Sequence, residues 1–97
     1  MPTYISLINW TDQGIRTFRD SLSRAEVAKQ AAQRLGGTMR ETYWTVGAYD
    51  IVAVSEFPDD ESGAAFLLQL GALGNVRSTT LRAYDAGELA GILGKLG

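Results

Sequence analysis

The chain contains neither histidine nor cysteine among its 97 residues. Without histidine it has no imidazole to act as a general base or to bind haem, and most transition-metal sites are excluded, which leaves only carboxylates and amides for a hard cation. We expect no cofactor and no metal site. Without cysteine it has no disulfide and no thiol chemistry, a composition that suits a reducing cytoplasm.

An excess of one charge and long apolar runs are also missing. The 11 acidic and 9 basic residues are scattered and leave a net charge of −2, so no basic stripe is available to hold a nucleic-acid backbone. No apolar run approaches the roughly 20 residues that cross a bilayer. With 45% hydrophobic residues, the chain can fill one core. We expect a single domain over residues 1–97, located in the cytoplasm, with no nucleic-acid or membrane partner.

Apolar periodicity and turn residues predict the order strand, helix, strand, strand, helix, strand and short terminal helix. The strands are expected at residues 3–10, 39–46, 50–57 and 76–84, with a turn at residues 11–14. Ser23, followed by Glu26, is predicted to cap the first helix, and Gly36 to end it. The second helix is expected to begin at Asp59 or Asp60. The terminal helix contains several glycines, so it should be marginal without a docking surface.

Gly47 and Ala48 are predicted to form a tight hairpin turn between the second and third strands. A two-residue loop of the type that begins with glycine would place Val46 opposite Tyr49. Trp44 would then lie opposite Ile51, and the side chains of the two strands would alternate between the faces of the sheet.

This order predicts a ferredoxin-like α+β fold, βαββαβ, in which an antiparallel sheet carries both main helices on one face and a short helix follows at the C-terminus. The other face would be bare. We expect it to carry Tyr43, Val52 and Val54, with some of Tyr4, Ile8, Trp10 and Tyr84. The second helix is apolar on more than one side. The predicted interface residues are therefore Tyr43, Val52, Val54, Phe66 and Leu70, and they would form a homodimer or higher oligomer.

Polar residues should meet where the first strand ends, the hairpin turns and the fourth strand starts. We define this turn edge by the candidate ligand-binding residues Asn9, Trp10, Thr11, Asp12, Gln13, Tyr49, Asp50, Asn75 and Arg77. They could orient a small polar or anionic molecule. The competing interpretation is that these turn-forming residues satisfy one another's hydrogen bonds, which is the more common outcome.

The bare face offers a second possible site. Tyrosines and charged side chains there could line a cavity between subunits, namely Tyr4, Tyr43, Tyr84, Glu41, Glu56 and Arg82. Aromatic residues on an uncovered sheet more often form an oligomer interface. RNA-binding domains with this topology carry a basic residue and spaced aromatics on the third strand, a signature that residues 50–54 lack.

The residues around the hairpin resemble the motif that names the GYD domain family. Tyr49-Asp50 follows Gly47, with residues 43–45 before it and Ile51-Val52 after it. Residues 10–14, 74–77 and 80–83 also resemble segments of that family. The resemblance implies a small bacterial or archaeal protein of unassigned biochemical role, related in fold to the dimeric α+β barrels. It implies assembly of subunits and supplies no catalytic residues.

Three functions remain open from the sequence. The first is a module that binds a small polar or anionic molecule, and the second is a structural or protein-interaction oligomer. The third is a cofactor-independent isomerase or oxygenase of the dimeric-barrel kind. In that enzyme Asp50 or Asp12 would act as the base, and Tyr49 or Arg77 would stabilise an oxyanion.

Overall fold

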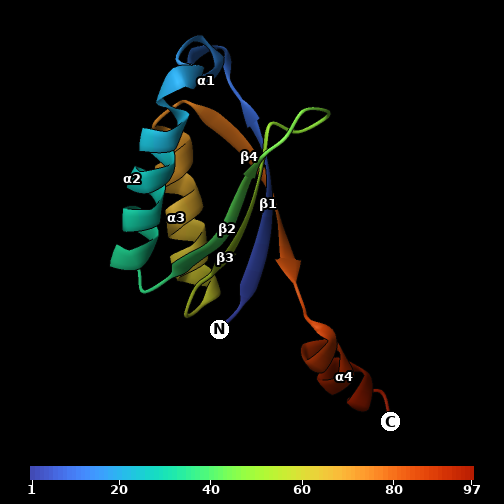
Figure 1. Cartoon of the computed structure of the whole chain (residues 1–97). Coiled ribbons are helices and arrows are strands. Elements are labelled where there is room, and N and C mark those ends of the chain that lie inside the picture. Colours follow the sequence, from blue (N-terminus) through green and yellow to red (C-terminus); the bar gives the residue numbers. More distant parts are fainter.

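A computed structural model describes residues 1–97 and shows a four-stranded antiparallel sheet with helices on one side (Figure 1). The elements in chain order are β1 (Thr3–Trp10), α1 (Asp12–Arg16), a 3₁₀ turn η1 (Phe18–Asp20), α2 (Ser21–Arg34), β2 (Thr38–Trp44), β3 (Ile51–Glu56), α3 (Asp60–Ala72), β4 (Val76–Ala83) and α4 (Ala86–Gly94). The strands lie in the order β2-β3-β1-β4. The predicted ferredoxin-like fold, with its short terminal helix, is confirmed.

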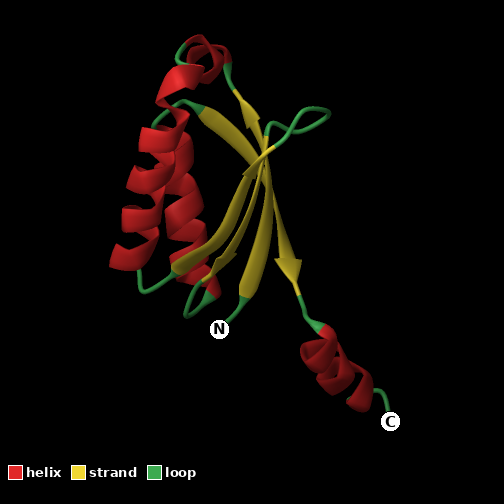
Figure 2. Cartoon of the chain, in the orientation of Figure 1, coloured by secondary structure: helices red, strands yellow, loops and turns green.

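Helices α2 and α3 form one layer over the sheet, and the opposite face has no covering element (Figure 2). On β1, the buried residues Ser6 and Ile8 face the helices. Ile5 and Leu7 face the other way and pair with Val54 and Val52 of β3. The sequence also predicts some of Tyr4, Ile8, Trp10 and Tyr84 on the bare face; the three that belong to β1 lie instead on the side of Ser6.

The core lies between the sheet and the C-terminal half of α2. Phe57 is 1% exposed and Ala32 is 0% exposed, and the ring of Phe66 lies 5.2 Å from that of Phe57. Phe66, at 4% exposed, is therefore unavailable as an interface residue, and Leu70 packs against the same cluster. The prediction of an interface at Phe66 is wrong because α3 turns that residue inward. Leu70 is half-buried, and its place in an interface stays a prediction. Leu68 and Leu73 are exposed.

The connection after β1 is more ordered than the predicted turn. Thr11 caps the short helix α1 by accepting the N–H of Gly14 at 3.1 Å. Helix α2 begins at Ser21 after Asp20, which makes no side-chain cap. The predicted capping box at Ser23 is therefore wrong, because that residue already lies inside the first turn of α2.

The hairpin keeps its predicted register but not its predicted turn. Trp44 pairs with Ile51, as expected. The Thr45 N–H donates to the carbonyl of Asp50 at 2.8 Å, so the loop between these two residues is longer than two residues. Val46 is fully exposed, and Gly47 has a φ of +154°.

Helix α4 extends away from the rest of the chain, beyond the end of β4 (Figure 1). The radius of gyration is 14.5 Å, whereas a compact domain of this length has about 12.5 Å. No strand or helix packs substantially on α4. None of the helices combines the length and hydropathy needed to cross a membrane.

Candidate functional site

The three segments of the turn edge do come together in the structure. The backbone N–H of Trp10 donates to Oδ2 of Asp50 at 2.9 Å, and the N–H of Asp50 donates to the carbonyl of Ile8 at 2.9 Å. On the other side, the N–H of Thr11 donates to the carbonyl of Asn75 at 3.1 Å, and Nε2 of Gln13 donates to Oδ1 of Asn75 at 2.9 Å. These contacts join the end of β1 to the hairpin and to the start of β4.

Several turn-edge groups are thus already bonded within the chain. Nε2 of Gln13 also donates to the carbonyl of Leu73, and the Thr11 hydroxyl donates to the carbonyl of Gly74. Arg77 lies opposite Asn9 in the β1–β4 register, and its exposed side chain makes no ion pair. It is the one turn-edge cation. Thr11 and Arg77 both border an open groove between α3 and β4.

Asp12 and Tyr49 are less closely involved. Asp12 is exposed in the first turn of α1, and its side chain makes no hydrogen bond. The carbonyl of Tyr49 accepts the Thr45 hydroxyl, a contact within the hairpin. No group of acidic side chains is placed so that it could hold a metal ion.

The tyrosines proposed for a second site are divided between separate contacts. The Tyr43 hydroxyl donates to Glu41, a hydrogen bond that raises the pKa of Tyr43. Burial, followed by the hydrogen bond to Asp60, raises the pKa of the Tyr4 hydroxyl to about 12. This phenol therefore stays protonated at neutral pH.

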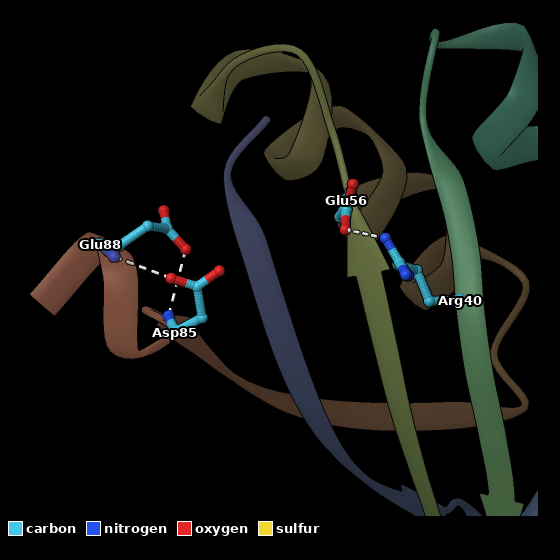
Figure 3. A network of polar contacts seen from close by, with 4 residues as sticks. All are labelled: Arg40, Glu56, Asp85 and Glu88. Carbon is cyan, nitrogen blue, oxygen red and sulfur yellow. Dashed lines mark hydrogen bonds and ion pairs between the residues drawn. The ribbon is translucent and has the colours of Figure 1, made fainter.

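The remaining members of that second set bond elsewhere. Glu56 forms an ion pair with Arg40 at 2.5 Å across β2 and β3 (Figure 3). The guanidinium of Arg82 lies 5.7 Å from the ring of Tyr4 and 4.5 Å from that of Tyr84. Tyr4, Arg82 and Tyr84 therefore lie together. Tyr43 with Glu41, and Glu56 with Arg40, make separate contacts, so the six residues do not form one site within a single chain.

The bare face of the sheet carries an apolar surface, which we call the open-face patch. It consists of Ile5, Leu7, Tyr43, Val52, Val54 and Leu81. Tyr43 is 56% exposed and Leu81 is 49% exposed. Contiguous apolar surface of this kind is a mark of interaction sites.

Helix α4 carries the second uncovered apolar surface. Asp85 and Glu88 form a complete capping box, with each side chain accepting the other residue's N–H (Figure 3). The helix start is therefore fixed locally. The apolar stripe that follows is exposed and consists of Leu89, Ile92, Leu93 and, just past the helix end, Leu96.

A cavity that the sequence analysis missed lies between the helix layer and the sheet. Its volume is about 210 Å³, and Trp10 and Asn75 of the turn edge lie in its wall. Most of its lining is apolar and comes from β1, β2, β3, α2 and α3. The sequence signal for it is the occurrence of small residues on both layers, Ala25 and Ala28 on α2 and Ser6, Ala53 and Ser55 on the sheet. Small side chains that face each other leave space between a helix and a sheet.

Comparison with known proteins gives consistent results. The family model of the GYD domain matches residues 4–93. A Thermus thermophilus protein named glutamine synthetase and cystathionine beta-lyase binding protein is 33% identical over 90 residues, which cover 92% of this chain and 95% of that protein.

Solved structures agree in fold. The crystal structure of TTHA0845 from Thermus thermophilus has a TM-score of 0.57 at 27% identity, covering 89% of this chain and 96% of the other. The crystal structure of MtbAldR has a TM-score of 0.68 at 15% identity, over 87% of this chain and 52% of that one, a likeness of fold alone. The match to the family model spans nearly the whole chain, the hairpin motif included, and the chain belongs to the GYD domain family.

Proposed function

We propose that this chain is a homodimeric binding protein whose partners are other proteins, and enzymes in particular. The observation that carries this proposal is α4, a capped helix with an exposed apolar stripe that stands clear of its own domain. The name of the Thermus thermophilus relative supports a protein partner of this class.

The spacing of the α4 stripe fits a helix that docks in a groove. Leu89, Ile92, Leu93 and Leu96 stand at i, i+3, i+4 and i+7, the anchor positions of that recognition mode. A helix this short, with interior glycines, is marginal in water by itself. Docking on a partner would supply the missing stabilisation.

The open-face patch suits contact with a second copy of the chain. A two-fold axis would place the patch against itself, so that one surface serves both subunits. Full burial of an apolar side chain contributes about 1.5–3 kcal/mol, and several together can offset the roughly 4–15 kcal/mol lost on association. The dimer would then present two α4 helices.

Dimer formation is tested by light scattering coupled to size exclusion. The native protein should have at least twice the chain mass of 10.5 kDa. Val54→Glu places a charge in the open-face patch and should shift the mass toward the monomer. Val46→Glu is the matched control, because Val46 is fully exposed at the hairpin. A native mass of 10.5 kDa would refute the dimer.

Partner binding is tested with glutamine synthetase and cystathionine beta-lyase purified from the same organism as the chain. We expect at least one enzyme to bind, and the double variant Leu89→Ser, Leu93→Ser to weaken that binding by about tenfold or more. Ala90→Ser is the control, since it changes α4 outside the stripe. Equal binding by the native protein and the stripe variant would exclude α4 as the docking element.

A second candidate function is the binding of a small polar or anionic molecule at the turn edge. The groove beside Thr11 and Arg77, and the absence of an ion pair for Arg77, favour it. Binding of small carboxylates, followed by calorimetry, should disappear in Arg77→Ala and persist in Arg16→Ala, a change at an exposed arginine in α1.

A cytoplasmic location is also part of the proposal, because a chain without cysteine needs no oxidising compartment.

A further inference from the structure

The cavity between helices and sheet exists because small residues face each other across it. Ser6, Ala53 and Ser55 form part of its floor, and Ala25 and Ala28 of α2 form part of its roof. Larger side chains, among them Trp10, Trp44, Met39 and Phe66, complete the lining. The small side chains on both layers leave space that larger ones would fill.

The size of this space is sufficient for a ligand. An engineered apolar cavity of about 150 Å³ stays dry and binds benzene, and the cavity here measures about 210 Å³. Its lining includes Val27, 52% exposed, and Trp44, 41% exposed. Surface residues in the lining provide a path of entry from solvent.

One polar group in the floor has no partner in the protein. The hydroxyl of Ser6 bonds to that of Thr80 at 3.0 Å, whereas the hydroxyl of Ser55 makes no hydrogen bond, although the residue is only 4% exposed. No enclosed polar side-chain atom in the chain lacks a partner. The Ser55 hydroxyl must therefore reach open space, and Ser55 lines the cavity.

The one charged group in the lining is held by neutral acceptors of the chain itself. Its one charged side chain is Arg24, and the guanidinium of that residue donates to the carbonyls of Gly14 and Thr17 at 3.2 and 3.1 Å and to the Thr17 hydroxyl at 3.2 Å. An anionic ligand would have to displace these hydrogen bonds to pair with Arg24, and a cationic ligand would find no acidic side chain in the lining. The chemistry of the lining selects a neutral molecule.

We propose that this cavity binds an uncharged, ring-sized apolar molecule with a single hydroxyl group, and that the hydroxyl bonds to Ser55. The site is independent of the open-face patch and of α4, so it can exist whether or not the chain binds proteins. A monocyclic phenol is the simplest molecule with these properties.

Three probes of similar size test the proposal on the full chain: p-cresol, toluene and benzoate. We expect p-cresol and toluene to raise the melting temperature and to shift the amide resonances of the cavity lining, with p-cresol binding more tightly. A hydrogen bond in this setting corresponds to a difference of up to about tenfold. Benzoate, which is ionised at neutral pH, should do neither.

Two variants separate the parts of the proposal. Ser55→Ala should bind toluene as the native protein does and should lose the preference for p-cresol. Ala28→Leu should fill the cavity and abolish binding of both probes while the chain stays folded, and Ala25→Leu serves if Ala28→Leu does not fold.

The absence of any shift with p-cresol or toluene would overturn the site. Unchanged binding in a folded leucine variant would place the probes elsewhere and overturn it equally. An undiminished p-cresol preference in Ser55→Ala would overturn the role of Ser55.

Discussion

The backbone N–H of Trp10 donates to the Asp50 carboxylate at 2.9 Å. The backbone pairing of β1 with β3 ends at Ile8 and Ile51, and beyond that pair this side-chain hydrogen bond continues the connection. The Asp50 N–H returns a hydrogen bond to the carbonyl of Ile8. Asp50 therefore fixes the last residues of β1 to the start of β3. This aspartate of the hairpin motif has a structural role in the chain.

Replacing Asp50 with alanine should lower the free energy of unfolding by about 1–3 kcal/mol, because the half-buried Trp10 N–H would lose its acceptor. Asp50→Asn should cost less, since the amide oxygen can accept the same hydrogen bond. Urea unfolding measures both values. If Asp50→Ala were as stable as the native protein, the contact would contribute nothing.

Gly14 allows α1 to pack directly on the start of β4. A Cβ at this position would lie 1.9 Å from the carbonyl oxygen of Asn75, a backbone atom that cannot move aside freely. Gly14→Ala should lower the free energy of unfolding by about 1–3 kcal/mol. Gly91→Ala is the control. No atom lies within 4 Å of a Cβ there. Alanine should therefore only favour the helical state of α4, by about 1 kcal/mol in the free energy of helix formation. Circular dichroism during urea unfolding reports both effects, and equal stability of the two variants would contradict the close packing.

Gly47 has a backbone conformation in the hairpin that residues other than glycine rarely adopt. Its φ of +154° falls outside the range of β-branched residues, although no atom lies within 4 Å of a Cβ. Gly47→Val should therefore lower the free energy of unfolding by about 1–3 kcal/mol, through backbone strain alone. The melting temperature should fall accordingly. Ala48→Val provides the comparison at the neighbouring position. Equal melting temperatures for the two variants would mean that the loop adjusts without cost.

The N-cap of α3 should make stability depend on pH. The Ser62 N–H donates to Asp59 at 2.8 Å, and this hydrogen bond holds the pKa of Asp59 below its usual value. Because the pKa is lower in the folded state, the stabilisation is complete above the unfolded pKa of about 3.9 and is lost as the pH falls through the folded value.

This pH effect can be isolated with two variants. The melting temperature of Asp59→Ala should lie below that of the native protein at about pH 6, and the gap should narrow toward about pH 3. Asp59→Asn keeps a capping oxygen without titrating, so its difference from Asp59→Ala should stay constant. A native-to-alanine gap independent of pH would rule out Asp59 as the titrating cap.

The candidate site was only partly predictable. The meeting of residues 9–14 with Asp50 and Asn75 followed from the strand order, since strand ends that share an edge must lie close together. The bonding of these residues to one another, and the cavity behind Trp10, depend on side-chain directions that the sequence pattern does not contain.

The sequence by itself determined the order of the four strands and the main helices and the pairing of Trp44 with Ile51. Those features depend on local signals such as periodicity and turn residues. Only the tertiary structure decided which side of β1 faces the helices, because Ile5 and Leu7 are as apolar as Ile8 and alternation cannot distinguish the two faces. It also decided that Phe66 turns inward and that α4 stands free, since each depends on which distant surfaces come within reach when the layers pack.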